Sequence, residues 1–168
     1  MTIESSTKPR HPWLGLAGWL AITFVAAVAG ALASRTSQDF YLSLARPSWA
    51  PPPWLFGPAW TFLYVTMAIA AWMVWRERGF RGARAALSIY LVQLVFNAMW
   101  TWLFFVRKQG AWSMADIAVL WCLVAVTLVA FYRHRRVAGL LIVPYLGWVT
   151  FAAALNYAVW RMNPQLLG

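Results

Sequence analysis

Residues that commonly carry out acid–base or metal chemistry are scarce in this sequence. It has four acidic residues and two histidines in 168 positions. His11 and His134 both adjoin basic segments, where we interpret them as solvated side chains. The sequence contains no Ser/His/Asp set, paired carboxylates, metal-ligand spacing or glycine-rich phosphate loop. We therefore expect no metal site, no required cofactor and no conventional acid–base catalysis.

Asp116 is the acidic residue that stands inside an apolar run, three residues after Ser113. This S-x-x-D spacing is typical of a capping box at the start of a helix. We interpret Asp116 first as a capping residue. The alternative is a buried functional carboxylate, because ionisable residues at membrane depth are costly and usually functional.

Polar and aromatic residues recur instead at helical spacing. Gln93, Asn97 and Thr101 stand four residues apart, so they share one helix face, which we expect to point inward. Such amides can simply join helices, yet aromatic walls with a few polar groups also bind flat apolar ligands. The aromatic partners at comparable spacing are Trp100 and Phe104, Trp60 and Tyr64, and Tyr145 and Trp148 with Ala152.

The composition determines where such a face can exist. Hydrophobic residues make up 62% of the chain and charged residues 11%, whereas a soluble domain has about 25% charged residues. A soluble enzyme, a disordered chain and a nucleic-acid-binding domain are therefore excluded, although the formal net charge is +10. We expect this charge to lie at a membrane surface.

Five apolar runs are each long enough to cross the roughly 30 Å of membrane hydrocarbon. We predict an all-α, integral membrane bundle of five transmembrane helices forming a single domain over residues 1–168. The short basic connections predict antiparallel neighbours, and Pro144 can bend the fifth helix. The predicted helices are 13–33, 56–75, 85–106, 113–131 and 137–160.

The first predicted helix has two further properties. The first run is about twice as long as the apolar part of a secretory signal, so we expect it to be retained. Small residues on that helix, Ala26 and Gly30, can pack helices within one chain or across a dimer.

The link over residues 34–55 contains Arg46, Trp49 and three consecutive prolines, and loops of this length tend to be functional. Cys122 is the sole cysteine, so an intramolecular disulfide is impossible.

Basic residues favour one orientation in an inner membrane. Nine Lys and Arg residues fall on the N-terminal side of the predicted bundle and five on the other, which places the N-terminus in the cytoplasm. Tryptophans at helix ends are interpreted as anchors in the headgroup region, where amphipathic indoles are favoured. These anchors are Trp13, Trp75, Trp112 and Trp160.

Three ordered segments closely resemble the TspO/MBR family, also known as the translocator protein, tryptophan-rich sensory protein or peripheral-type benzodiazepine receptor family. They are Arg46–Trp60 (RPSWAPPPWLFGPAW), Gln93–Trp100 (QLVFNAMW) and Pro144–Arg161 (PYLGWVTFAAALNYAVWR). The resemblance runs from about the first helix to Asn163. Ser48 departs from it, since some bacterial relatives have a second Trp beside Trp49.

The resemblance implies a bundle of five transmembrane helices, often dimeric, that binds porphyrins such as protoporphyrin IX. Some members of the family also bind cholesterol and synthetic isoquinoline carboxamide or benzodiazepine ligands, so the resemblance implies these as further possible ligands. The family's sterol-associated pattern matches Leu155, Tyr157 and Arg161, although an interfacial Tyr with a snorkelling Arg explains this pattern equally well. The implied pocket residues are Trp49, Trp60, Tyr64, Asn97, Trp100, Trp121, Trp148 and Ala152.

We therefore expect a porphyrin-binding membrane receptor or regulator, a homodimer in contact with membrane lipid, in a bacterial cell envelope and without nucleic acid as partner. Arg35 or Arg46 could pair with porphyrin propionates. Two alternatives stay open: light-dependent porphyrin breakdown, with Trp60 and Trp148 as redox-active indoles, and transport of porphyrin or cholesterol across the bilayer. With no His in any predicted span, histidine ligation of haem iron is not expected.

Overall fold

The computed structural model describes residues 12–33 and 37–168. The described chain is helical, and five of its segments are long and apolar enough to span a membrane. The main elements are α1 (Pro12–Ala33), α2 (Ser37–Ser43), the short 3-10 turn η1 (Pro53–Leu55), α3 (Phe56–Gly82), α4 (Arg84–Thr101), the π-helical turn η2 (Trp102–Val106), α5 (Gly110–His134), α6 (Arg136–Leu140), α7 (Val143–Met162) and α8 (Pro164–Leu167).

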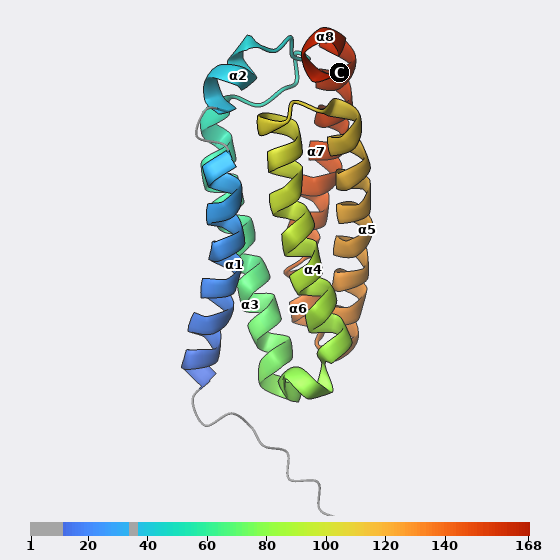
Figure 1. Ribbon diagram of the computed structural model, residues 1–168. Helices are drawn as coiled ribbons and strands as arrows, with labels where there is room; N and C mark the ends of the chain where they lie inside the picture. Colours follow the sequence, from blue (N-terminus) through green and yellow to red (C-terminus); the bar gives the residue numbers. More distant parts are fainter. Residues whose placement is uncertain (1–11, 34–36) are drawn as a thin grey trace, which may run out of the picture.

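The long helices lie side by side as an elongated bundle (Figure 1). Helix α1 packs against α3 and α4, α4 packs against α5, and α5 packs against α7. The short helices α2 and α8 lie together at the end that carries the C-terminus (Figure 1). The predicted all-α bundle of five transmembrane helices is confirmed.

Several helices extend beyond the predicted apolar runs. Helix α3 continues past Trp75 to Gly82 with a kink at Gly79, whose φ of 64° is not helical, and α5 begins at Gly110 and ends at His134. These extensions carry basic residues, whose long side chains can reach water beyond the apolar run. The apolar run therefore marks the part of a helix that lies in hydrocarbon, and the helix itself is longer.

Pro144 accounts for the interruption of the fifth span. Helix α6 ends at Leu140, a turn follows, and Pro144 stands in the first turn of α7. Proline has no N–H to donate, which is tolerated in a first helical turn but breaks the ladder inside a helix. The predicted bend is therefore present as a break between two helices.

The described part of the link between α1 and α3, residues 37–55, forms a cap over one end of the bundle. The side chain of Asn163 accepts from the Ala45 N–H at 2.9 Å and donates to the Ala45 carbonyl at 2.8 Å. Lys108 lies over the ring of Phe40, 4.7 Å from its centroid. These contacts join the link to the end of α7 and to the α4–α5 turn, so it is not a plain flexible linker.

Close helix contacts rely on small residues. A Cβ atom added at Gly110 would lie 2.1 Å from Cδ1 of Trp160, so only glycine lets the start of α5 approach α7 so closely. Gly30 is similarly turned toward Thr101, with 3.5 Å between a built Cβ and the threonine Oγ1. The small-residue face of α1 therefore packs at least partly within the chain.

Basic residues gather at the end of the bundle opposite the cap. Arg135 donates to a Glu77 carboxylate oxygen at 3.0 Å, which places the α3 extension beside the α5–α6 turn. Both segments belong to the more basic side counted in the sequence. Such exposed ion pairs contribute little stability, and the contact mainly shows that these two arginine-rich segments share one end.

Candidate functional site

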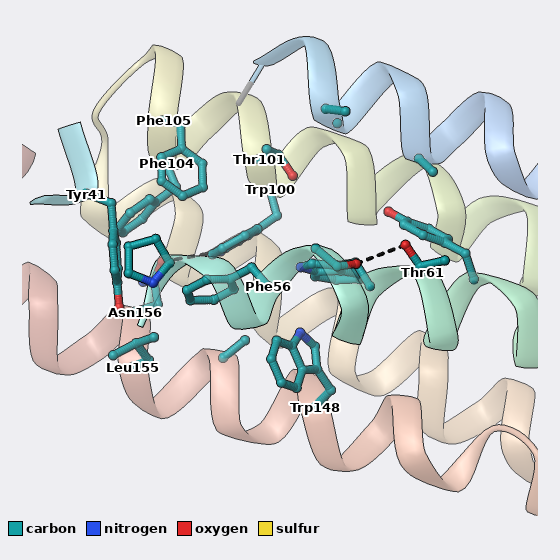
Figure 2. Close-up of a pocket in the computed structure, with 18 of the residues that line it drawn as sticks. Tyr41, Phe56, Thr61, Trp100, Thr101, Phe104, Phe105, Trp148, Leu155 and Asn156 are labelled. Carbon is teal, nitrogen blue, oxygen red and sulfur yellow. Dashed lines mark hydrogen bonds between the residues drawn. The ribbon is translucent and has the colours of Figure 1, made fainter. Parts of the chain in front are cut away.

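A cavity of about 690 Å³ lies inside the capped half of the bundle. Helices α1, α3, α4 with η2, and α7 form its sides, and Tyr41 of α2 closes one end (Figure 2). This volume falls in the range of roughly 300–1,000 Å³ that suits small-molecule ligands. The aromatic lining residues are Phe24, Tyr41, Trp54, Phe56, Trp60, Tyr64, Trp100, Phe104, Phe105, Trp148 and Phe151.

The rings that face the cavity pack against one another. Trp60 stacks on Tyr64 with 5.4 Å between ring centroids, and it meets Trp148 edge to face at 6.2 Å. Phe56 contacts Trp148 in the same edge-to-face manner at 6.0 Å. Aromatic pairs favour these offset and edge-to-face arrangements. The cavity thus presents flat, apolar surfaces of the kind that a planar ligand can stack on.

Behind this wall, Asn97 holds two buried tyrosines. Its carbonyl oxygen accepts from the Tyr64 hydroxyl at 2.6 Å, and its amide donates to the Tyr145 hydroxyl at 3.0 Å. All three side chains are buried. The inward face predicted for Gln93 and Asn97 is confirmed, because both are buried between helices. Asn97 itself does not line the cavity, so its direct effect is to position Tyr64.

A second polar cluster was not singled out from the sequence. Asn156 lines the cavity, and its carbonyl oxygen accepts from the Trp100 indole N–H at 3.2 Å and from the Ser113 hydroxyl at 3.0 Å. Figure 2 shows the Trp100–Asn156 bond across the site. The spacing of Trp148, Ala152 and Asn156 could have indicated it, since these residues follow one another at intervals of four.

Besides the exposed Trp54, two half-buried tryptophans at the cavity have indole N–H groups that remain available. Trp60 and Trp148 have ring contacts but no hydrogen-bond partner among the residues that the structure describes. Trp100 differs, because its N–H is bound to Asn156. Buried indole groups usually find a partner. Trp60 and Trp148 are therefore the donors that a bound ligand could use.

The capping-box interpretation of Ser113 and Asp116 is wrong. Helix α5 begins at Gly110 with Gln109 as its N-cap, one turn earlier than predicted. The Ser113 hydroxyl instead has two acceptors within reach of its one proton, the Gly110 carbonyl at 2.9 Å and the Asn156 side-chain oxygen at 3.0 Å, and Asp116 is 5% exposed with neither carboxylate oxygen bonded to any described residue. Asp116 is thus buried, as the alternative interpretation requires, while a functional role for this carboxylate stays a prediction. No group of three or more metal-binding side chains occurs among the described residues.

The structure brings together most of the implied pocket residues. Trp60, Tyr64, Trp100, Trp148 and Ala152 all line the cavity, as does Leu155 of the sterol-associated pattern. The remaining three, Trp49, Asn97 and Trp121, do not line it.

These three residues lie outside the cavity for different reasons. Trp121 is 40% exposed and donates to Thr150 at 2.8 Å on the outer side of α5 and α7. Trp49 is 50% exposed but packs edge to face on Phe151, which does line the cavity, with 5.9 Å between centroids. Asn97 lies behind Tyr64. Trp49 and Asn97 therefore support cavity residues, whereas Trp121 does not.

No charged side chain among the described residues lines the cavity. The guanidinium carbon of Arg46 lies 4.8 Å from the centroid of the Tyr41 ring, at the capped end. Burial raises the pKa of Tyr41, and Arg46 acts in the opposite direction. Tyr157 and Arg161 are exposed and share an outer face of α7, away from Leu155. Arg35 lies outside the described residues.

Comparison with known proteins agrees with this arrangement. The profile of the TspO/MBR family matches residues 19–161. The chain is 39% identical to the translocator protein of Sus scrofa, covering 90% of this chain and 92% of that protein. It is 40% identical to the tryptophan-rich sensory protein of Cereibacter sphaeroides, with coverage of 90% and 92%. It is 36% identical to the tryptophan-rich protein TspO of Archaeoglobus fulgidus, with coverage of 88% and 95%.

Proposed function

Because the chain belongs to the TspO/MBR family of multi-pass membrane proteins, we propose that it is a membrane receptor or regulator whose aromatic cavity binds a porphyrin such as protoporphyrin IX. The observation that carries this proposal is the cavity of about 690 Å³ walled by aromatic rings. Sterols and isoquinoline carboxamide or benzodiazepine ligands are the competing occupants, and a bacterial cell envelope is the proposed location.

The cavity offers a porphyrin three kinds of interaction. The ring system stacks on Trp60, Tyr64 and Trp148, whose faces supply most of the apolar contact. The free indole N–H groups of Trp60 and Trp148 orient it. Arg46, at the capped end beside Tyr41, pairs with a propionate through charge-assisted hydrogen bonds.

Iron is not needed for this mode of binding. The sequence has histidines at positions 11 and 134 alone, and His134 ends α5 at the basic end of the bundle. Haem iron is commonly held by an axial histidine or thiolate, and neither type of side chain lines the cavity. Metal-free protoporphyrin IX is therefore expected to bind about as tightly as haem. A strong preference for haem, with a Soret shift typical of axial ligation, would contradict this mode.

The central test is a titration of the purified protein in lipid nanodiscs with protoporphyrin IX, followed by tryptophan fluorescence quenching. Trp148→Ala removes a stacking face and should weaken binding about tenfold, which corresponds to roughly 1.4 kcal/mol. Trp121→Ala is the matched control, because it removes an indole outside the cavity and should leave affinity unchanged. Unchanged affinity in Trp148→Ala, at an unaltered melting temperature, would contradict the proposal.

A second titration tests the propionate contact. Arg46→Gln should weaken binding of protoporphyrin IX but not of its dimethyl ester, because the ester has no carboxylate to pair with the guanidinium. Arg161→Gln serves as the control, since Arg161 lies on the outer face of α7. Equal losses for the acid and the ester would mean that Arg46 maintains the shape of the cap rather than binding the propionate.

Dimerisation and sterol binding are separate proposals. The outward-facing Tyr157 and Arg161 can take a lipid or sterol at the membrane interface, where a tyrosine ring and a snorkelling arginine are both favoured. The homodimer would form through an outer face of the bundle. Cross-linking in nanodiscs and a thermal-shift comparison of sterol with porphyrin test these proposals, because a bound ligand raises the apparent melting temperature.

A further inference from the structure

A second, smaller cavity lies on the outer side of the bundle between α3 and α7, which we call the α3–α7 seam. Its volume is about 260 Å³, and its lining includes Ala59 and Phe62 of α3 together with Pro144, Gly147, Trp148 and Phe151 of α7. No charged side chain lines it. Phe62 is 58% exposed, and both helices belong to candidate membrane spans. The seam therefore faces membrane hydrocarbon rather than water.

The seam and the main cavity share two side chains. Trp148 and Phe151 line both, and their rings lie against each other with 5.7 Å between centroids. A ligand in the main cavity and one in the seam would thus both contact these two side chains. Trp148 and Phe151 form the partition between an inner and an outer apolar space.

The Trp148 side of this partition is held by packing without a hydrogen bond. The Trp148 indole N–H has no hydrogen-bond partner among the described residues, and its neighbours are Phe56, Trp60 and Phe151. Turning the Trp148 side chain therefore breaks no polar bond. Trp100 and Trp121 differ, because their indole N–H groups are bound to Asn156 and Thr150.

Small residues leave the seam open on both helices. Ala59 lines it from α3, and Gly147 lines it from α7. A Cβ atom built at Gly147 meets no atom within 4 Å, so the space beside this glycine is empty. Helix α7 also begins close by, after the break that precedes Pro144. The outer space thus has room for part of a flat ring.

We propose that the α3–α7 seam is an outer subsite through which a flat apolar ligand passes between the bilayer and the main cavity, by rotation of Trp148 and Phe151. The inference rests on the proposed function for the identity of the ligand. The recognised chemistry is a planar conjugated ring system dissolved in the membrane, and protoporphyrin IX is the probe.

Gly147→Phe tests this route, because its ring would fill the seam without meeting a neighbour at Cβ. Stopped-flow fluorescence in nanodiscs should show protoporphyrin IX associating and dissociating at least about tenfold more slowly, with an unchanged Kd. A barrier on the route must slow both directions equally. Gly18→Phe is the matched control, since its built Cβ on α1 also meets nothing within 4 Å and Gly18 lines neither cavity.

Other outcomes overturn the route. Unchanged rates in Gly147→Phe would exclude the seam as the path, and a change in dissociation alone would make it part of the binding site rather than a passage. Gly57 of α3, which lines the main cavity but not the seam, is also open at its built Cβ. Slower binding in Gly57→Phe, with normal rates in Gly147→Phe, would place the access route away from the seam.

A measurement without porphyrin separates this inference from the proposed function. Gly147→Cys, in a Cys122→Ser background because Cys122 is exposed, carries a nitroxide spin label in bilayers. The label should be relaxed by oxygen, which concentrates in hydrocarbon, and not by a water-soluble nickel complex. Relaxation by the nickel complex would overturn the seam as a membrane passage. Failure of the wild type to bind protoporphyrin IX would instead refute the proposed function.

Discussion

Two sides of the main cavity hold their tryptophans in different ways. On the α4 side, Trp100 donates its indole N–H to Asn156, which also accepts from Ser113 of α5. On the α3 and α7 side, Trp60 and Trp148 contact each other through their rings, with 6.2 Å between centroids and no hydrogen bond from either indole to a described residue. Trp100 is thus tied into a hydrogen-bonded cluster that joins three helices, whereas Trp60 and Trp148 are held by packing.

Because of this difference, the tryptophans on the two sides of the aromatic lining have different roles. A buried hydrogen bond fixes an orientation, since breaking it leaves unpaired polar groups in a region without water. Ring contacts are worth about 0.5–1.5 kcal/mol per pair and tolerate rotation more readily. The α4 side therefore sets the shape of the cavity, and the α3–α7 side is suited to accept a ligand. Variants on the two sides should affect different measurements.

The largest expected effect is on stability, from Asn97→Leu. This change keeps the approximate volume of the side chain but removes the partner of both Tyr64 and Tyr145. Each buried hydroxyl left unpaired should cost about 1–3 kcal/mol. The melting temperature in nanodiscs should therefore fall by several degrees, and ligand binding should weaken because Tyr64 is no longer held.

Thr150→Val provides the control for Asn97→Leu. It also removes a hydrogen bond to an aromatic side chain, the 2.8 Å bond from Trp121, but at an exposed position. Its melting temperature should stay near that of the wild type. If both variants melted alike, the buried Asn97 cluster would contribute no more than a surface contact, and the distinction between the two sides of the cavity would fail.

A smaller effect distinguishes the two kinds of tryptophan directly. Trp100→Phe deletes the N–H that binds Asn156, whereas Trp60→Phe deletes an N–H with no partner among the described residues. Because the ring change is the same, the two variants should differ in unfolding free energy by about 1 kcal/mol, the net value of one hydrogen bond. Trp60→Phe should be the more stable variant, and equal stabilities in matched bilayers would contradict the comparison.

Much of the fold could be predicted because the bilayer imposes a simple rule on the chain. Every backbone polar group at membrane depth must be bonded within the segment, so each long apolar run becomes a helix. The inward face of Gln93 and Asn97 could also be predicted, since amides avoid lipid. The ends of α3 and α5 could not be predicted well, because arginine-bearing turns continue a helix into the interface while breaking the apolar run.

The site was predicted less completely, for a related reason. Lipid is as apolar as the bundle interior, so hydrophobicity does not tell which face of a transmembrane helix points inward. Trp121 and Trp148 are both tryptophans in apolar runs, yet Trp121 is 40% exposed on the outside and Trp148 lines the cavity. The position of Asp116 was mistaken because the true start of α5, at Gly110, lies before the apolar run.

A weaker effect concerns the capped end of the cavity, through the ionisation of Tyr41. Burial raises the pKa of this phenol above its ordinary value of about 10. Between about pH 10 and the raised pKa of the folded state, the folded protein therefore holds a proton that the unfolded chain has lost. Stability contributed by Tyr41 is complete below about pH 10 and falls as the pH rises further. Melting temperatures at increasing pH should thus decline slightly more in the wild type than in Tyr41→Phe, and a steeper decline in the variant would reverse the sign.

The smallest expected effect tests whether the packed side of the cavity is only a binding surface. Trp60 and Trp148 contact each other, and they are the redox-active indoles in the alternative of light-dependent porphyrin breakdown. The double variant Trp60→Phe, Trp148→Phe keeps two stacking faces but removes both indoles. If the rings serve for binding, illuminated porphyrin at equal occupancy should disappear at the same rate with the wild type and the variant. Faster loss with the wild type, followed by absorbance and product analysis, would instead assign these two tryptophans a chemical role, and the loosely held side would then be the reactive one.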